Sequence, residues 1–224
     1  MTLIVALDPP LEEDPIKWSI GIIEKTREYV SGFKIGLPML LRTGVDAVKQ
    51  LTAATGGSSV IADLKLADIG FVMSLSAAAL ARAGVRGVIA HSFVGVRDAL
   101  DALKRTCERE GMDLILVVAM SHRGAEEVMT PVVDKLLGIA KEVAPWGVVL
   151  PATKPRLIQR GRRILGEHIK ILAPGVGAQG ARPGSALCAG ADYEIVGRAI
   201  TRAPDPADAV LRIRKEQMEV VKTC

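Results

Sequence analysis

Short runs of consecutive hydrophobic residues recur along the chain, and a longer segment with hydrophobic residues every three to four positions follows each one. The first pattern is typical of a strand buried on both faces and the second of an amphipathic helix. The predicted strands are 3–7, 32–36, 60–66, 87–91, 114–120, 147–150, 170–173 and 193–196. The predicted helices are 15–29, 38–52, 74–83, 96–109, 131–143, 155–165, 184–189 and 206–221.

Eight strand-helix units in 224 residues predict an α/β fold in which helices cover a parallel sheet. We expect a compact (β/α)8 TIM barrel, with residues 1–224 forming a single barrel domain. No linker, low-complexity tract or block of like charges marks a second domain. A doubly wound open sheet is the alternative.

Polar residues cluster at or just after the carboxyl ends of the predicted strands. These positions are Asp8, Lys34, Asp63, Lys65, His91, Ser121, Lys154, Gly175 and Arg198. In a parallel barrel all strand carboxyl ends meet at one mouth, where active sites are built. The barrel prediction therefore brings these dispersed residues into one candidate site.

The most unusual stretch is 60–69, where a hydrophobic strand carries Asp63, Lys65 and Asp68. Side chains alternate across a strand, so Asp63 and Lys65 are expected on one face, with Asp68 converging near the strand end. Flanking carboxylates favour the ammonium form of Lys65, which suits an acid that protonates a carbanion and not a Schiff-base nucleophile. A structural ion-pair network is the alternative interpretation.

Residues 174–180 contain a literal Gly-x-Gly-x-x-Gly after a strand, the pattern of a dinucleotide-binding turn. Residues 181–184 suit a loop better than the helix that such a turn requires. A glycine-rich loop after the seventh strand of a barrel instead predicts a phosphate site, to which Gly197 and Arg198 after the eighth strand would contribute.

The remaining composition restricts the function classes. The net charge is +4, but basic residues are spread along the chain and aromatic content is 3%, so we expect no nucleic-acid partner. No hydrophobic run is long enough to span a membrane, and a cytoplasmic location is expected. The cysteines Cys107, Cys188 and Cys224 are far apart, and we expect reduced packing residues, not a disulfide framework.

No spacing of histidines or cysteines predicts a metal site, and no cofactor motif is recognised. His91 and His122 each stand alone, and packing or hydrogen-bonding roles are expected for both. Ser121 and His122 are adjacent and would face opposite ways, so they are not a nucleophile-base pair. The predicted mouth thus suits metal-independent acid chemistry on a phosphorylated small molecule.

Together these motifs resemble the orotidine 5′-phosphate decarboxylase family over nearly the whole chain. The matching segments are Ala6–Asp8, Phe33–Gly36, Asp63–Ile69, Met120–His122 with Gly124–Ala125, Pro174–Gly180 and Ile195–Arg198. The Asp-x-Lys-x-x-Asp element is shared with a wider set of barrels. Lys34 and the glycine-rich loop restrict the resemblance to this family. The resemblance implies decarboxylation of orotidine 5′-phosphate to UMP by a homodimer without cofactor or metal.

The resemblance also implies residue roles. Lys34, Asp63, Lys65 and Asp68 would form a charged tetrad in which Lys65 protonates C6 of the pyrimidine and Asp68 reaches the partner's site. Asp8 and Lys34 would hold ribose hydroxyls, Ser121 would contact the base, and Gln179 and Arg198 would bind the phosphate. The other implied substrate contacts are Ile69, Pro174, Gly175 and Gly197.

Two departures and two alternatives remain. Val72 stands where the family usually has a threonine directed to the neighbouring subunit's ribose, and Arg123 replaces a proline common in the family. One alternative is a Mg2+-dependent sister decarboxylase or aldolase acting on a sugar phosphate, in which a glutamate takes the place of Lys34. The other is a non-catalytic barrel that binds phosphate or RNA, which would not need the tetrad.

Overall fold

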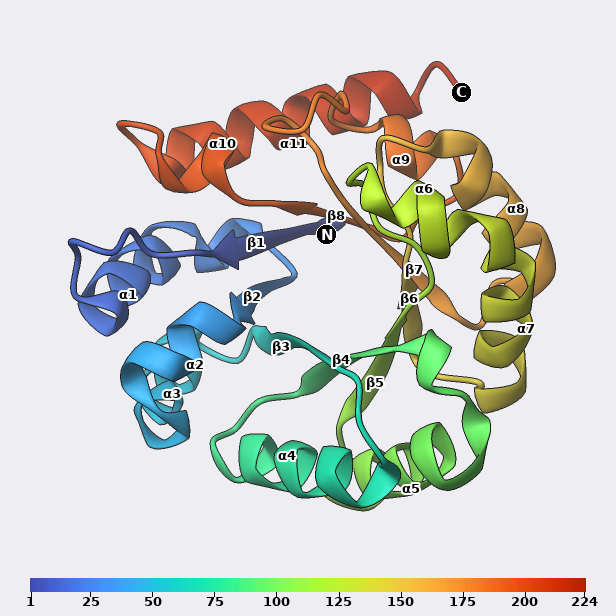
Figure 1. Cartoon of the computed structure of the whole chain (residues 1–224). Helices are drawn as coiled ribbons and strands as arrows, with labels where there is room; N and C mark the ends of the chain where they lie inside the picture. Colours follow the sequence, from blue (N-terminus) through green and yellow to red (C-terminus); the bar gives the residue numbers. More distant parts are fainter.

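The computed structural model describes residues 1–224 as a closed barrel of eight parallel strands in sequential order, surrounded by helices (Figure 1). The strands are β1 (Leu3–Leu7), β2 (Gly32–Gly36), β3 (Ser59–Leu66), β4 (Gly87–His91), β5 (Asp113–Val117), β6 (Gly147–Val149), β7 (Lys170–Pro174) and β8 (Tyr193–Val196). Strand β8 pairs with β1 and closes the barrel. The (β/α)8 prediction is confirmed, and the open doubly wound sheet is excluded.

The helices are α1 (Pro15–Thr26), α2 (Leu37–Thr43), α3 (Val45–Ala54), α4 (Gly70–Arg82), α5 (Asp101–Glu110), α6 (Gly124–Val128), α7 (Val133–Val143), α8 (Pro155–Leu165), α9 (Ser185–Cys188), α10 (Arg198–Thr201) and α11 (Pro206–Val221). Helical turns at Arg27–Tyr29, Ser92–Val94 and Thr130–Val132 extend or precede them. The helix predicted at 96–109 begins only at Asp101, because Arg97 and Asp98 before it have non-helical backbone angles. The predicted helix 38–52 is broken at Gly44, whose φ of 74° is outside the helical region. The short helices α6 and α10 were not predicted.

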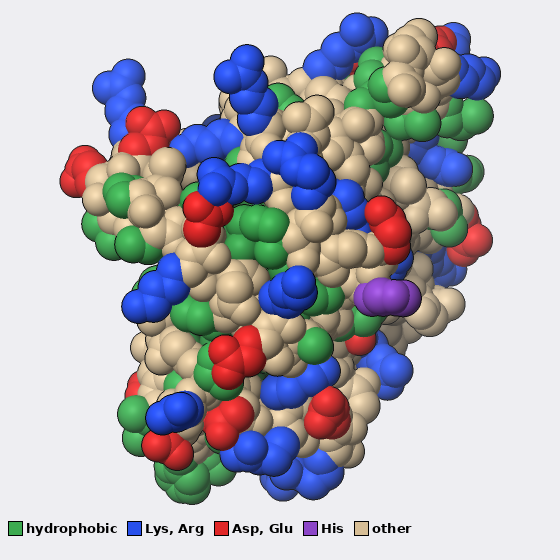
Figure 2. All heavy atoms as spheres, turned by 90° about the vertical axis from the view of Figure 1, so that its right-hand side faces the viewer, with side chains coloured by type: hydrophobic (Ala, Val, Ile, Leu, Met, Phe, Trp, Pro, Cys, Tyr) green, Lys and Arg blue, Asp and Glu red, His purple; other side chains and the backbone are tan.

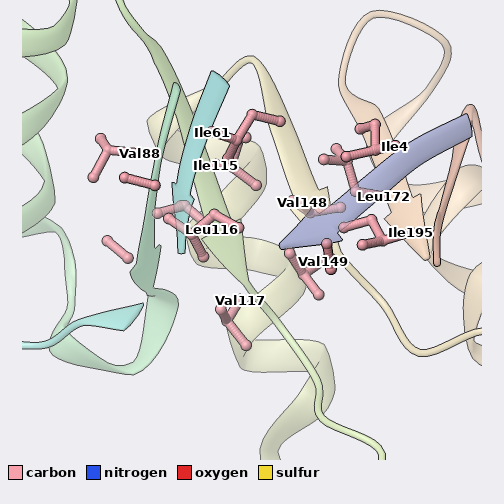
Figure 3. Close-up of a cluster of buried hydrophobic side chains, with 14 of the residues drawn as sticks. Ile4, Ile61, Val88, Ile115, Leu116, Val117, Val148, Val149, Leu172 and Ile195 are labelled. Carbon is pink, nitrogen blue, oxygen red and sulfur yellow. The ribbon is translucent and has the colours of Figure 1, made fainter. Parts of the chain in front are cut away.

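The core lies inside the barrel and between the barrel and its helices. Figure 3 shows hydrophobic side chains from opposite strands, including Ile4, Ile61 and Leu172, meeting in this core. Each is nearly inaccessible to solvent, and burial of such a side chain contributes about 1.5–3 kcal/mol. This packing fixes the strands and therefore the positions of the side chains at the mouth.

Strand β3 departs from regular pairing where it approaches the mouth. Its register against β4 shifts between Ala62 and Leu66, and Lys65 within this interval has a φ of 47°. A non-glycine residue with positive φ is uncommon and costs roughly 1–2 kcal/mol. The irregularity falls on the residue that the sequence indicates as the central acid.

The structure corrects the expectation for the cysteines. Cys188 in α9 and Cys224 at the end of the chain form a disulfide across 36 residues, with Cα atoms 5.8 Å apart. Their distance along the sequence gave no sign of this proximity, because α11 is folded back along the segment that contains α9. Cys107 is a free, buried thiol, and burial raises its pKa to about 12.

Charged side chains are distributed over the surface. On the face in Figure 2, lysine and arginine side chains are scattered and acidic side chains lie between them, without a single continuous basic block. No helix of the structure combines the length and the hydrophobicity needed to cross a bilayer.

Candidate active site

A cavity of about 310 Å³ opens at the carboxyl ends of the strands. Ten of the twelve predicted site residues line it: Asp8, Lys34, Asp63, Lys65, Ser121, Pro174, Gly175, Gln179, Gly197 and Arg198. They come from six strands or the loops that follow them, and span 191 positions from first to last. The prediction of one shared mouth thus holds for these ten residues, whereas His91 and Lys154, which were also expected there, do not line the cavity.

Three charged side chains form a connected network on one side of the cavity. The Lys65 ammonium lies 2.9 Å from both carboxylate oxygens of Asp63, and the Lys34 ammonium lies 3.3 Å from Oδ2 of Asp63. The side chains of Lys34 and Asp63 are 11% and 13% exposed, while Lys65 is 39% exposed. Asp63 is thus held between two ammonium groups, and Lys65 is the member most open to a ligand.

This arrangement determines the charge of Asp63. Burial by itself raises the pKa of this carboxyl, but the Lys34 and Lys65 ammonium groups outweigh burial and hold its pKa below the usual range. Asp63 is therefore ionised at neutral pH. A fixed negative charge lies beside any group that contacts Lys65.

Asp68 and Ile69 do not line the cavity of their own chain. Asp68 is exposed, makes no ion pair with either lysine, and accepts a hydrogen bond from the Ile69 amide at 2.7 Å. The expectation that Asp68 converges on Lys65 within the chain is wrong, because Asp68 lies past the end of β3 at Leu66 and is directed to solvent. Ile69 is 63% exposed at the start of α4 and lies with Phe71 on the outer surface.

The glycine-rich segment 175–184 forms the opposite part of the cavity and is folded on itself. Gly177 donates to the Ala181 carbonyl, and Gly180 donates to the Gly177 carbonyl, each at 2.9 Å. The amides of Ala178 and Gln179 donate to no protein acceptor and remain available to an anion. Gly175 has a φ of 110°, which a residue with a side chain rarely adopts. The loop predicted to bind phosphate thus leaves two backbone amides unpaired, and no continuing helix follows it as a dinucleotide-binding turn requires.

Two further polar groups complete the mouth. Arg198 begins α10, is exposed, and has no carboxylate within ion-pair distance. Asp8 lies between two glycines: a Cβ on Gly36 would be 3.4 Å from Oδ1 of Asp8, and one on Gly197 would be 3.9 Å from Oδ2. The cavity therefore presents a guanidinium and a carboxylate that are not neutralised by ion pairs within the chain.

The sequence prediction did not assign several residues that the structure brings to the site. The hydrophobic wall consists of Ala6, Ile89, Val117, Ala119, Met120, Val149, Val176, Ala178 and Ile195. Their alternation with outward-facing residues at the strand ends was the available signal. A flat, apolar ligand surface could bind against this wall, which makes the cavity suitable for a heterocyclic base.

The histidines differ in their environments. His91 is buried, stacks on Phe93 with ring centroids 4.5 Å apart, and its Nδ1 has no hydrogen-bond partner. Burial lowers the pKa of His91, and the nearby Lys65 charge lowers it further, although Asp63 acts in the opposite direction. Of the two roles expected for His91, packing or hydrogen bonding, the structure shows packing. His122 is exposed.

Comparison with known proteins gives a consistent result. The family model described as "Orotidine 5'-phosphate decarboxylase / HUMPS family" matches residues 1–213. An orotidine 5′-phosphate decarboxylase of Aeropyrum pernix is 47% identical over 210 residues, covering 93% of this chain and 85% of the relative. That of Pyrococcus horikoshii is 44% identical over 214 residues, covering 96% and 98%.

Solved structures agree. The orotidine 5′-monophosphate decarboxylase of Sulfolobus solfataricus has a TM-score of 0.87 at 37% identity, covering 98% of this chain and 99% of that one. The Methanocaldococcus jannaschii enzyme complexed with the inhibitor BMP has a TM-score of 0.86 at 30% identity, covering 96% and 98%. The sequence resemblance is thereby confirmed: the chain belongs to the orotidine 5′-phosphate decarboxylase / HUMPS family.

Proposed function

We propose that this chain is a carboxy-lyase that converts orotidine 5′-phosphate to UMP in pyrimidine biosynthesis, without a metal, and that Lys65 protonates C6. The observation that carries the proposal is the Lys34–Asp63–Lys65 network in a cavity whose other side is a glycine-rich phosphate loop. Residues 1–224 would act as one catalytic barrel domain. The family and the names of its relatives support this reaction.

The charge network suits loss of CO2. An ionised Asp63 beside the substrate carboxylate would repel it in the ground state, and the repulsion would end when CO2 leaves. The Lys65 ammonium would stabilise the carbanion at C6 and then transfer a proton to it, so that the electron pair of the broken C–C bond forms the new C–H bond. Lys34 would keep Asp63 ionised throughout.

The rest of the cavity would hold the nucleotide. Gln179, Arg198 and the free loop amides would bind the phosphate, with Pro174, Gly175 and Gly197 lining its site. Asp8 and Lys34 would bind ribose hydroxyls, and Ser121 would contact the base against the hydrophobic wall. Binding of the remote phosphate would supply energy for placing the substrate carboxylate beside Asp63.

We also propose a homodimer in which Asp68 and Ile69 complete the partner's site. Both residues lie outside their own cavity, and large hydrophobic side chains are exposed beside them: Ile69 is 63% exposed, Phe71 70% and Leu75 58%. Exposed hydrophobic groups of this size favour an interface. The partner's Asp68 would then supply the second carboxylate expected next to Lys65. Val72, 40% exposed on the same surface, offers no hydroxyl to a ribose across such an interface.

The alternative within the same family is a Mg2+-dependent enzyme acting on a sugar phosphate. In this chain the Asp63 carboxylate is already occupied by two ammonium groups, and Lys34 stands where such an enzyme would place a carboxylate. Lys34 would repel a divalent cation at this position. The donor set therefore favours the metal-independent reaction.

The test is the decrease in absorbance of orotidine 5′-phosphate with the purified protein in excess EDTA, alongside Lys65→Ala. We expect turnover that EDTA leaves unchanged and that falls by at least about 10⁴-fold in the variant, since Lys65 acts in the transition state. Turnover of orotidine 5′-phosphate that requires Mg2+ would contradict the proposal. So would the absence of this turnover in a protein that acts on a sugar phosphate. An unchanged rate in Lys65→Ala would contradict the role of Lys65 alone.

A further inference from the structure

A buried carboxylate outside the cavity remains unexplained by the proposed reaction. Glu194 lies on β8 directly before Ile195, which lines the cavity. Because strand side chains alternate, Glu194 is directed away from the barrel interior and toward the outer helices. It is fully inaccessible to solvent and has no lysine or arginine within ion-pair distance. A buried ionisable group without a counter-ion is costly unless hydrogen bonds compensate it.

Glu194 is compensated by neutral donors from two segments. Its Oε1 accepts from the Gly184 amide at 3.0 Å and the Ala186 amide at 3.1 Å. Its Oε2 accepts from the Gly184 amide at 2.9 Å and from Nε2 of Gln217 at 2.9 Å. Gly184 ends the phosphate loop, Ala186 lies in α9, and Gln217 lies in α11. One carboxylate thus joins the end of the loop to the C-terminal helix.

The backbone at Gly184 is in close contact with α11. A Cβ at this position would lie 2.8 Å from Cβ of Val220 and 3.1 Å from the Gln217 carbonyl oxygen, and Gly184 has a φ of 88°. Any side chain would force the loop end away from the helix. The Glu194 hydrogen bonds and this close contact fix the same point, Gly184, which precedes Glu194 of β8 by ten residues.

We propose that Glu194 is a positioning residue that anchors the downstream end of the phosphate loop on α11, and so sets the affinity for the phosphate of the ligand. The inference rests on the proposed function, because it assigns loop 175–184 to phosphate binding. The upstream end of the loop is fixed by β7, which ends at Pro174. With Gly184 held as well, the loop amides face the ligand with less conformational entropy left to lose on binding.

The first test is amide hydrogen exchange of the unliganded protein, which needs no activity. Glu194→Gln keeps the size of the side chain but removes its charge and one acceptor oxygen. We expect peptides covering 176–188 to exchange at least about ten-fold faster in this variant, because the Gly184 and Ala186 amides lose a charged acceptor. Unchanged exchange in these peptides would overturn the anchor.

The second test compares UMP with uridine, which lacks the phosphate, by calorimetry on the same variant. We expect the Kd of UMP to rise about ten-fold and that of uridine to stay within about two-fold, with KM for orotidine 5′-phosphate rising more than kcat falls. Equal weakening of both ligands, or none, would overturn the inference. Failure of the wild-type protein to decarboxylate orotidine 5′-phosphate while it binds UMP would instead reject the proposed reaction alone.

Two further variants control for stability. Thr26→Val removes a buried hydroxyl that donates only within α1, to the Ile22 carbonyl, and should leave the UMP-to-uridine ratio unchanged. Gln217→Leu removes the outer donor to Glu194 and keeps the carboxylate, and should raise the Kd of UMP about three-fold. If Glu194→Gln fails to fold, Gln217→Leu decides the question, and an unchanged UMP affinity there would overturn the anchor.

Discussion

The ammonium of Lys65 lies 2.9 Å from both carboxylate oxygens of Asp63, although the Lys65 backbone has a φ of 47° and the two residues are only two positions apart on β3. The left-handed conformation coincides with the break in register between β3 and β4. Strain of this kind persists only where the surrounding structure enforces it, and it clusters at functional sites. The ion pair and the backbone irregularity thus occur at the same residue, Lys65.

Glycine should be better tolerated than alanine at position 65. Alanine retains the cost of a positive φ, roughly 1–2 kcal/mol, whereas glycine avoids it and loses about 0.5–1 kcal/mol through unfolded-state entropy. We expect Lys65→Gly to exceed Lys65→Ala in free energy of unfolding by about 0.5–1 kcal/mol in urea denaturation, with both inactive. The matched pair is Ser59→Gly and Ser59→Ala at the regular start of β3, where alanine should be the more stable. If the alanine variant were more stable than the glycine variant at position 65 as well as at position 59, the Lys65 backbone would be unstrained.

Acidification should destabilise the fold through His91. Burial and the Lys65 charge hold its pKa below that of the unfolded chain, about 6.5, so the folded protein keeps it neutral. The unfolded chain binds the extra proton, and the stability contributed by neutral His91 is present above pH 6.5 and is lost as the pH falls toward the folded pKa. We expect His91→Gln to lose less stability than the wild type over this range in denaturant titrations.

The same histidine reports on the Lys65 charge. In Lys65→Met the pKa of His91, followed by NMR of the ring protons, should rise relative to the wild type, because a nearby positive charge has been removed. His168, which lies outside the cavity, serves as an internal reference in the same spectra. A His91 pKa that is unchanged or lower in Lys65→Met would mean that the ammonium does not act on this ring.

The proposed shared site makes a prediction for mixed dimers. Lys65→Ala and Asp68→Ala subunits should each be inactive alone, but a mixed dimer would retain one intact site, formed by Lys65 of one chain and Asp68 of the other. Random mixing should restore about one quarter of wild-type activity, since half of the dimers are mixed and each has one of two sites. Mixed dimers that form and remain inactive would place Asp68 in the site of its own chain.

The Cys188–Cys224 disulfide should be detectable and stabilising. Without reductant, mass spectrometry should show a peptide cross-link between these cysteines, while Cys107 stays unlabelled by iodoacetamide because it is buried and its pKa is raised to about 12. For a 36-residue loop the chain-entropy model gives a stabilisation of up to about 4 kcal/mol. Cys224→Ser should lower the Tm of the oxidised protein and leave that of the reduced protein nearly unchanged. Equal Tm values in the oxidised state would contradict the bond.

Patterns along the chain were sufficient to predict the fold class and to place most candidate site residues at one mouth. Continuous hydrophobic strands such as 3–7 and 87–91 were predicted with the bounds of β1 and β4, because buried parallel strands have no polar face to obscure their ends. Lys34, Asp63 and Arg198 could be assigned to one mouth because barrel topology places every strand carboxyl end at the same edge. Local pattern and general topology were sufficient for these residues.

The remaining features depend on contacts between segments that are distant in the sequence. The left-handed Lys65 coincides with the break in register between β3 and β4, and Asp68 beyond it lies outside the cavity. Glu194 gave no signal in the sequence, since its donors come from Gly184 and a helix more than twenty residues later. The Cys188–Cys224 bond likewise depends on the folding back of α11. Contacts between segments distant in sequence are set by how helices cover the barrel, and the spacing of residues along the chain does not encode them.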